Sequence, residues 1–350
     1  MSGEAVIGVV GRDVPIEVFD AVGARVRRLD ALPRGAAGPA FADAFAEAGE
    51  ILGTGIDPDA TATLAHVLAD PSGLDAIVLC SDADATQRLY YALRELARRE
   101  HDRGLPPVHL ADVLHLPRAS SLAYTAAEVA RLQDALGDWT GRRPSAGDVA
   151  DAARARGQVR RALWLLADLR PAISGADFAL LRARADELAP EAALVALREA
   201  VASARRSSPA DLPRIALTGS SQWGPAVVER IEQCGVRVVA DDCAGGALGL
   251  ELDVREPSVD GIAERAWRDG QSAHRGSALE RAASLAVRAE RAGAAAIVSY
   301  ARRRDDAAMW EVGTLRAATA LPVVVVHEQA AGDIDLSVLR GGLEQIGMLR

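Results

Sequence analysis

The sequence predicts an α/β fold with two Rossmann-like parallel-sheet domains and a helical segment between them. Strand and helix patterns alternate in the first third of the chain, only helical patterns occur from about residue 120 to 207, and the alternation returns after residue 213. Such alternation is typical of β-α-β units with parallel sheets. We therefore expect an N-terminal α/β domain at 1–118, a helical segment at 119–207 and a C-terminal α/β domain at 208–350.

The N-terminal domain is expected to begin with a buried strand and a helix. Asp13 is suited to cap that first helix, with Pro15 in its first turn. Short apolar runs predict strands at 5–10, 25–29, 74–80 and 106–110. Helical spacing of apolar residues predicts helices at 41–52, 61–70 and 84–100.

The middle of the chain reads as three long helices, and the C-terminal domain follows a linker at 207–213. Breaks between the three helices are expected at 141–147 and 170–175. Strands are then predicted at 214–219, 236–242, 294–300 and 321–328. Helices are predicted at 224–235, 278–293, 305–319 and 336–349.

Composition excludes several classes of protein. The 350 residues are 49% hydrophobic and 25% charged, with a net charge of −9 and no lysine. An acidic chain argues against non-specific nucleic-acid binding and against a polybasic membrane anchor. No apolar run is long enough to cross a membrane, the start lacks the pattern of a signal peptide, and three cysteines cannot build a disulfide framework. We expect a cytoplasmic protein.

Candidate site residues follow the predicted strands, because ligands of open parallel sheets bind at the carboxyl ends of strands. These positions include Cys80-Ser81-Asp82, Gly219-Ser220-Ser221 and Asp241-Asp242-Cys243. Each is also an ordinary place for a turn or a helix cap. In GSSQWG (219–224), backbone N–H groups before a helix could take an anionic group.

Other motifs are absent or local. The six histidines lack metal-site spacing, and the chain has no GxSxG, GxGxxG or P-loop lysine, so no metal ligand is predicted. Arg302, Arg303 and Arg304 form a charge cluster with two aspartates at a strand end. They suit either a solvated surface or the binding of a phosphate or carboxylate.

Five segments together carry a resemblance to a known family, and PRIALTGSSQWGPAVVERIEQCGVRVVADDCAGG is the most specific of them. The five segments are 14–29, 74–95, 169–183, 213–246 and 293–328. They resemble the 2-hydroxyacyl-CoA dehydratase and benzoyl-CoA reductase family, in particular its D-component type of subunit. The resemblance runs along nearly the whole chain.

The resemblance implies two related subunits, each with two Rossmann-like domains and helices between them. It implies an acyl-CoA substrate near a [4Fe-4S] cluster that three cysteines of each subunit hold, and an ATP-dependent activator protein that delivers an electron. The products would be an enoyl-CoA or a dearomatised ring.

The cluster ligands implied by the family are missing here. Residues 54–60 hold no cysteine, the family's Cys-Asp pair reads Ser81-Asp82 with Cys80 one position early, and ARRRDD replaces the third ligand region. Because iron–sulfur clusters are held by thiolates, we expect no cluster on this chain alone. The arginines at the third position suit an anion better than a metal.

Three hypotheses remain open. The chain is a cluster-free subunit of a heteromer, a heterodimer or larger, whose homologous partner holds the [4Fe-4S] cluster. Alternatively the fold is a cluster-independent enzyme or binder of a CoA thioester or other anionic ligand, or it is a non-catalytic assembly subunit. Ser81, Asp82, Cys80 and Glu17 are the candidate catalytic residues. Gly219, Ser220, Ser221, Arg302, Arg303 and Arg304 are the candidate ligand-binding residues. Glu17 also suits a first-turn helix dipole.

Overall fold

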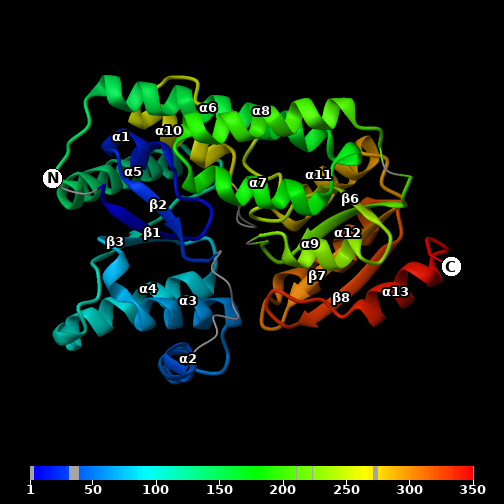
Figure 1. The fold of residues 1–350 in the computed structure, drawn as a ribbon, viewed down its shortest axis with the longest axis horizontal. Helices are drawn as coiled ribbons and strands as arrows, with labels where there is room; N and C mark the ends of the chain where they lie inside the picture. Colours follow the sequence, from blue (N-terminus) through cyan, green and yellow to red (C-terminus); the bar gives the residue numbers. More distant parts are fainter. Residues whose placement is uncertain (1–3, 31–38, 210, 223, 271–274, 350) are drawn as a thin grey trace. The chain divides into compact units, whose positions relative to one another are not determined.

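The structure is a computed structural model that describes residues 4–30, 39–209, 211–222, 224–270 and 275–349. It forms two compact units (Figure 1). The first comprises Met1–Gln158, Ala185–Glu191 and Leu252–Arg275, and the second comprises Val159–Arg184, Ala192–Glu251 and Gly276–Arg350. The predicted α/β fold is confirmed, since each unit contains a four-stranded parallel sheet with flanking helices.

The sheet of the first unit has the strand order β2-β1-β3-β4. Its strands are β1 (Val6–Val10), β2 (Arg25–Arg28), β3 (Ala76–Cys80) and β4 (Val108–Ala111). Side chains of β3 alternate between two cores, with Val78 on one face and Ile77 and Leu79 on the other. This alternation is the period-2 pattern of a strand that is buried on both faces.

Helices cover both faces of this first sheet. The core on one face includes residues of α1 (Glu17–Val22), α5 (Ala119–Thr140), α6 (Ala146–Asp168) and α10 (Val259–Arg268). The core on the other face includes residues of α2 (Pro39–Leu52), α3 (Pro58–Ala69) and α4 (Asp84–Arg99). Figure 1 shows α3 and α4 on the opposite side of β1 and β3 from α1 and α5.

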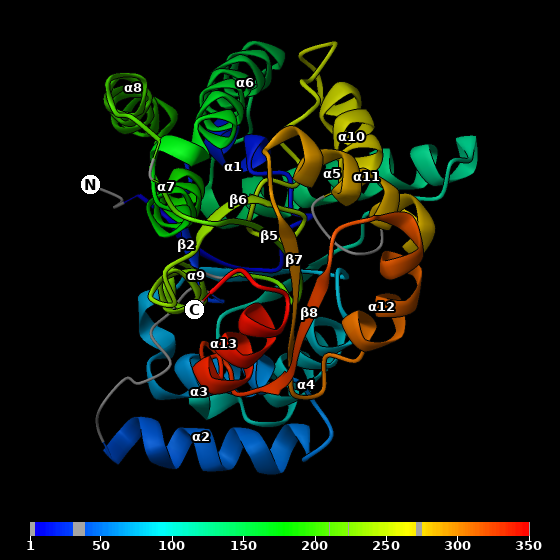
Figure 2. The ribbon, with the colours of Figure 1, turned by 90° about the vertical axis from the view of Figure 1, so that its right-hand side faces the viewer.

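The sheet of the second unit repeats the same order, as β6-β5-β7-β8. Its strands are β5 (Arg214–Gly219), β6 (Arg237–Asp241), β7 (Ala296–Arg302) and β8 (Val323–Gln329). One face packs against α9 (Ala226–Glu232) and α13 (Leu336–Gln345), and the other against α11 (Ala278–Arg291) and α12 (Ala307–Ala318) (Figure 2).

The helical segment contains one more helix than expected. Between α6 and α8 (Pro190–Arg206) lies α7 (Gly175–Glu187), and α10 was also not predicted. The sequence does contain a helix-start signal for α10, namely Ser258. Its side chain accepts a hydrogen bond from the Gly261 amide, 3.1 Å away, as an N-cap residue does. The expected boundaries at 118 and 207 stay a prediction.

Two local expectations are wrong. Asp13 does not cap the first helix, because α1 begins at Glu17 and its N-cap residue, Ile16, makes no side-chain capping bond. The predicted helix 224–235 is shorter, since α9 ends at Glu232 and leaves Cys234 beyond it in a buried position. In the described part of the chain, no helix combines the length and apolarity that a membrane crossing requires.

Candidate functional site

Cys80 ends β3 at the carboxyl edge of the first sheet, and its side chain is completely buried. A Cβ atom on Gly11, which has a φ of +89°, would overlap the Cys80 sulfur and lie 2.8 Å from an Asp82 carboxylate oxygen. Burial and the charges of Asp82 and Asp13 raise the pKa of Cys80 well above its usual value. The thiol is therefore neutral at physiological pH.

Asp82 lies beside Cys80 and contacts the loop after β1. Its Oδ2 accepts a hydrogen bond from the Arg12 amide, 2.6 Å away. Burial, together with the charge of Asp13, raises the pKa of Asp82 to about 6, although the Arg12 amide opposes the shift. A carboxyl group that titrates near neutrality at a strand end is well suited to give and take protons.

The side chain of Ser81 makes its contact elsewhere, at the end of β4. Its hydroxyl donates a hydrogen bond to Oδ1 of Asp112, and the hydroxyl of Tyr124 donates to Oδ2 of the same carboxylate at 2.8 Å. Tyr124 is exposed, so this relay reaches the surface of the unit. Ser81 and Asp82 are thus sequence neighbours with separate hydrogen-bond partners.

Two buried arginines fix the loop after β1. Arg28 binds Asp30 through two hydrogen bonds of 2.6 and 3.1 Å, and also donates to the Gly11 carbonyl at 2.5 Å. The Gly11 amide in turn donates to Asp30 at 2.9 Å. Arg12 pairs with Asp186 at 2.9 Å. Because buried charges need partners, this network holds the backbone that faces Cys80 and Asp82.

His115 is a site residue that the sequence did not reveal. Its Nε2 lies 2.9 Å from Oδ2 of Asp13, and its Nδ1 lies 3.1 Å from the carbonyl oxygen of Trp267. Both partners present oxygen atoms, and an imidazolium, which donates from both ring nitrogens, would satisfy both contacts. Burial lowers the pKa of His115, but the hydrogen bond and charge of Asp13 outweigh burial and raise it.

Glu17 begins α1, as expected, and its side chain is buried. Its Oε1 lies 3.4 Å from Nε of Arg265 on α10. This ion pair joins two helices on one face of the first sheet. The catalytic role of Glu17 stays a prediction.

The carboxyl edge of the second sheet is closed by Gly219. With a φ of +110°, it packs so tightly on β7 that a Cβ atom would overlap the carbonyl oxygen of Tyr300. The Ser220 amide donates to that same oxygen at 2.9 Å. This amide therefore has a partner within the fold, and α9, with only seven residues, begins later at Ala226.

Ser220 ties the ends of β5 and β7 together. Its hydroxyl donates to Asp305 at 2.5 Å and accepts from the Arg302 amide at 2.9 Å. The Arg302 guanidinium is buried and donates to the carbonyl oxygen of Ser221 at 2.6 Å and to its hydroxyl at 3.1 Å. Arg303 and Arg304 are exposed. Of the three predicted anion-binding arginines, these two present their side chains to solvent.

The DDCAGG stretch forms a structural loop after β6. Asp241 pairs with the buried Arg170 and accepts from the Ala247 amide at 2.8 Å. A Cβ atom on Gly246 would overlap the Asp241 carboxylate. Arg170 also lies over the ring of Phe178, with 4.8 Å between its guanidinium carbon and the ring centroid.

A further polar pair lies at the end of β8. The hydroxyl of Ser299 lies 2.9 Å from Nε2 of His327, and burial lowers the pKa of His327. Arg304 and Glu328 have φ angles of 69° and 58°, the only positive values among the described non-glycine residues. Both lie at the carboxyl ends of neighbouring strands, where such strain is often associated with function.

The thiols do not fit an iron–sulfur cluster. Cys80 belongs to the first unit, and Cys234 and Cys243 belong to the second; all three are buried. Burial and two aspartates raise the pKa of Cys243, as burial does for Cys80, so both favour the thiol over the thiolate that a cluster needs. Among the described residues, no group of three or more His, Cys, Asp or Glu side chains could hold a metal ion.

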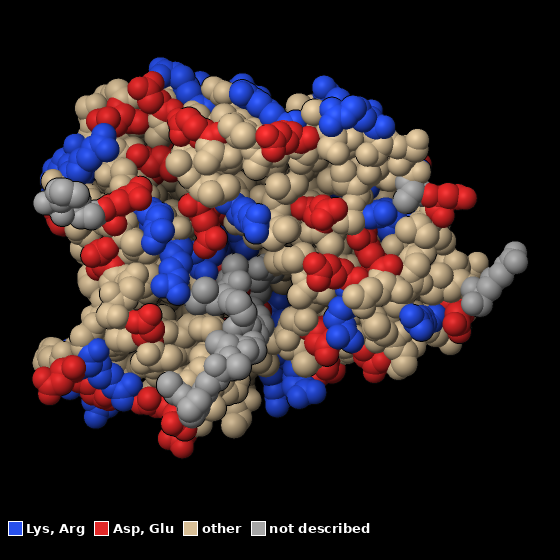
Figure 3. All heavy atoms as spheres, in the orientation of Figure 1, with Lys and Arg blue, Asp and Glu red and all other residues tan. Residues whose placement is uncertain are grey.

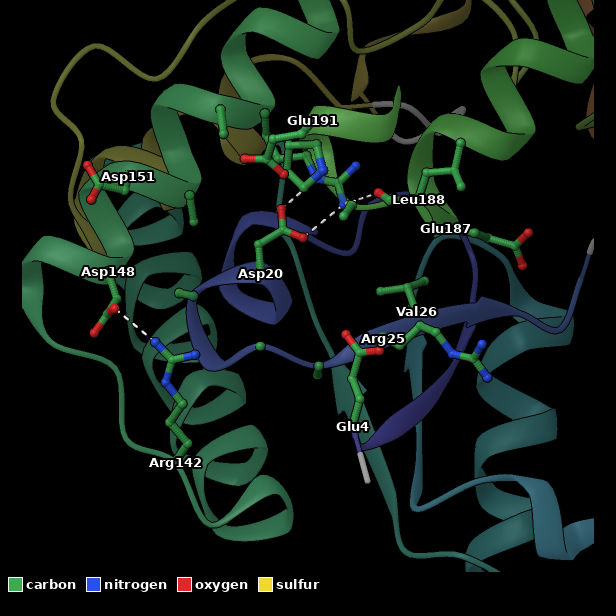
Figure 4. A pocket seen from close by; sticks show the side chains of 18 residues that line it. Glu4, Asp20, Arg25, Val26, Arg142, Asp148, Asp151, Glu187, Leu188 and Glu191 are labelled. Carbon is green, nitrogen blue, oxygen red and sulfur yellow. Dashed lines mark hydrogen bonds and ion pairs between the residues drawn. The ribbon is translucent and has the colours of Figure 1, made fainter. Parts of the chain in front are cut away.

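A pocket of about 350 Å³ lies at the other end of the first sheet (Figure 4). Its lining includes Glu4, just before β1, and Arg25, the first residue of β2. Asp20 and Arg156 pair through two hydrogen bonds, of 2.5 and 2.9 Å, as the dashed lines in Figure 4 show. This pocket is at the amino ends of the strands, away from Ser81 and Asp82.

Charges of both signs are interspersed on the face of the molecule in Figure 3. That face shows no single extended basic patch.

Comparison with solved structures gives only weak likenesses. The SBP FpvC from Pseudomonas aeruginosa in complex with Ni²⁺ has 14% identity and a TM-score of 0.23, with 98% of this chain and 94% of that chain covered. The same protein in complex with Mn²⁺ has 14% identity and a TM-score of 0.23, with coverages of 98% and 96%. These scores carry no argument about this chain. No curated protein matches it.

A family comparison is informative. The model of the 2-hydroxyglutaryl-CoA dehydratase D-component matches residues 13–333, which include every strand of the two sheets except β1. The match confirms the resemblance that the sequence segments carry. The chain therefore belongs to the 2-hydroxyglutaryl-CoA dehydratase D-component family and is a dehydratase-like subunit.

Proposed function

We propose that this chain is the cluster-free subunit of a dehydratase-like heteromer that acts on an acyl-CoA thioester, with the redox cluster on a homologous partner chain. The family match supports the dehydratase-like part of this proposal. The observation that carries the rest is the state of the three cysteines, which are buried and divided between two units. A subunit of this family with such thiols needs a partner to supply a cluster.

In this proposal the first sheet contributes proton transfer. A dehydration removes a hydroxyl group and a proton, so it needs groups that exchange protons near neutral pH. Asp82, with its raised pKa, is such a group, and Ser81 belongs to a relay that reaches the exposed Tyr124. Cys80 positions the Gly11 loop as a neutral, buried thiol.

The test is anaerobic expression of the chain alone and together with a co-encoded homologue, followed by analysis of iron and acid-labile sulfide. We expect both only in the co-purified complex. The matched control is a chain with Cys80→Ala, Cys234→Ala and Cys243→Ala, which should leave the iron content of the complex unchanged. Iron on the isolated chain, or its loss in this control, would contradict the proposal.

The alternative is a cluster-independent enzyme or binder of a CoA thioester or other anion. The exposure of Arg303 and Arg304 favours it. Iron near zero in both preparations would favour this alternative, or an assembly subunit without catalysis. Arg303→Ala with Arg304→Ala should then abolish binding of butyryl-CoA, measured by calorimetry. Unchanged binding in that variant would leave the assembly role.

A further inference from the structure

A groove of about 350 Å³ lies between α5 and α10 in the first unit. Its floor is a stripe of apolar side chains, three alanines and one leucine, on one face of α5. These side chains belong to Ala119, Leu122, Ala123 and Ala126. Their spacing of three, four and seven residues places them in line over two helical turns, or about 10 Å.

The opposite wall of the groove is acidic. It contains Asp260 and Glu264, four residues apart on α10, and Glu256 in the turn before that helix. Glu264 pairs with Arg268 at 3.2 Å and with Arg255 at 3.5 Å. Glu256 and Asp260 are exposed, and neither forms an ion pair with another described residue. The wall thus keeps two uncompensated carboxylates.

The two helices that form the groove are fixed to each other. The indole N–H of Trp267 on α10 donates to the carbonyl oxygen of Leu116, just before α5, at 2.8 Å. His115 binds the carbonyl oxygen of the same Trp267. Ile262 and Ala263 of α10 are buried in the core that α5 shares. A groove held in this way needs no ordering when a ligand enters it, which favours affinity.

We infer that the groove between α5 and α10 docks a basic amphipathic helix of a partner protein. An apolar stripe at helical spacing is the surface that an amphipathic helix buries when it lies in a groove. The two carboxylates without an ion pair, those of Glu256 and Asp260, match Arg or Lys side chains on such a helix, so charge complementarity favours a basic helix. The inference goes beyond the proposed function, because it holds whether or not the partner carries a cluster.

The test uses two synthetic helical peptides of 18 residues, about 27 Å long. Both carry the same stripe of Leu and Ala, and one has Arg where the other has Glu. Fluorescence anisotropy with the full chain should show saturable binding of the basic peptide, weakened by salt, and none of the acidic peptide. Hydrogen exchange should show protection in α5 and α10. Equal binding of both peptides, no binding, or protection elsewhere would overturn the inference.

Two variants locate the binding. Ala123→Trp fills the exposed floor and should weaken the basic peptide about tenfold or more, as loss of a well-packed contact does. Glu256→Gln with Asp260→Asn should weaken it about fivefold, because two surface charge pairs are lost. Asp43→Asn with Glu50→Gln on α2 makes the same charge change on exposed residues away from the groove and should change nothing.

Each variant is first checked for an unchanged melting temperature, and Ala123→Arg replaces Ala123→Trp if the latter unfolds. Undiminished binding by the floor variant, or equal effects of the α2 control and the wall variant, would disprove docking at this groove. If the chain alone forms a dimer that Ala123→Trp dissociates, the groove belongs to a second copy of this chain and the inference of a basic partner helix is wrong.

Discussion

The carboxyl edges of the two sheets share a plan and differ in chemistry. Both sheets have the same strand order, and in both a glycine with positive φ follows or ends the first strand and packs on the third. Gly11 faces the thiol of Cys80 in the first sheet, whereas Gly219 faces the backbone of Tyr300 in the second. Each edge also has a buried Arg–Asp pair, Arg28–Asp30 in one and Arg170–Asp241 in the other.

The difference lies in which groups can still exchange protons. At the first edge, Asp82 titrates near neutrality beside a neutral thiol. At the second edge, the Arg302 guanidinium and Ser220 are held by other groups of the same edge. The same strand order therefore carries one edge with a carboxyl group that titrates near neutrality and one edge whose polar groups bind each other.

The largest expected effect comes from removing Asp241. Asp241→Ala leaves Arg170 buried without its partner and should lower the free energy of unfolding by about 3–5 kcal/mol. Chemical denaturation measures the loss. Asp30→Ala in the first unit should cost about as much, for the same reason. A loss below 1 kcal/mol in either variant would mean that water solvates the charge of that arginine once its aspartate is removed. The two edges would then not depend in the same way on a buried Arg–Asp pair.

The two glycines sharpen the comparison. Gly219→Ala should cost about 2–4 kcal/mol, because its methyl group meets backbone at a strained φ. Gly11→Ala should cost less, because its methyl group meets side-chain atoms that can move. The control is Gly53→Ala, which has a φ of +80° but no neighbour within 4 Å and tests strain alone. Equal costs for Gly219→Ala and Gly53→Ala would show that close packing on β7 is unimportant.

The histidines of the two units should respond to pH in opposite directions. The raised pKa of His115 means that its stabilisation is complete below about pH 6.5 and is lost as pH rises through the folded-state pKa. His115→Gln should therefore cost about 1–3 kcal/mol at pH 6 and less at high pH. Urea denaturation from pH 5 to 9 measures the difference.

His327 supplies the contrast. Its pKa is lowered, so the unfolded chain binds its proton more readily and stability falls as pH drops below about 6.5. His327→Gln should remove that acid-side loss, which is about 1 kcal/mol or less for a half-buried ring. The same sign of pH dependence for both histidines would contradict the assigned protonation states.

A comparably small effect is expected at Asp82. Its folded-state pKa is about 6, above the ordinary value of 3.8, so the folded chain holds a proton that the unfolded chain has released. Stability should therefore fall as pH rises from about 4 to 6. Asp82→Asn keeps an acceptor for the Arg12 amide and should gain about 1 kcal/mol at pH 7, since partial exposure screens the charge. Asp75→Asn, at the amino end of β3, is the control and should leave this pH window unchanged.

The sequence by itself determined the strands and the fold class, because short apolar runs such as 76–80 and 296–301 can only be buried when helices cover both faces of a sheet. The sequence also indicated the family of the chain and showed that only three cysteines are available as possible cluster ligands. Local patterns did not reveal α7. They also suggested Asp13 as a helix cap, whereas its side chain contacts His115, about a hundred positions later in the chain.

Only the tertiary structure decided the state of the site residues. The pKa of Asp82 is raised because its side chain is buried beside Asp13. The guanidinium of Arg302 is turned away from solvent, where it donates to the carbonyl oxygen of Ser221. Both relations join segments far apart in the chain, at strand ends that the parallel sheet brings together. Charge, burial and hydrogen bonding act through space, so the chemistry of these residues followed from the fold and not from their order in the sequence.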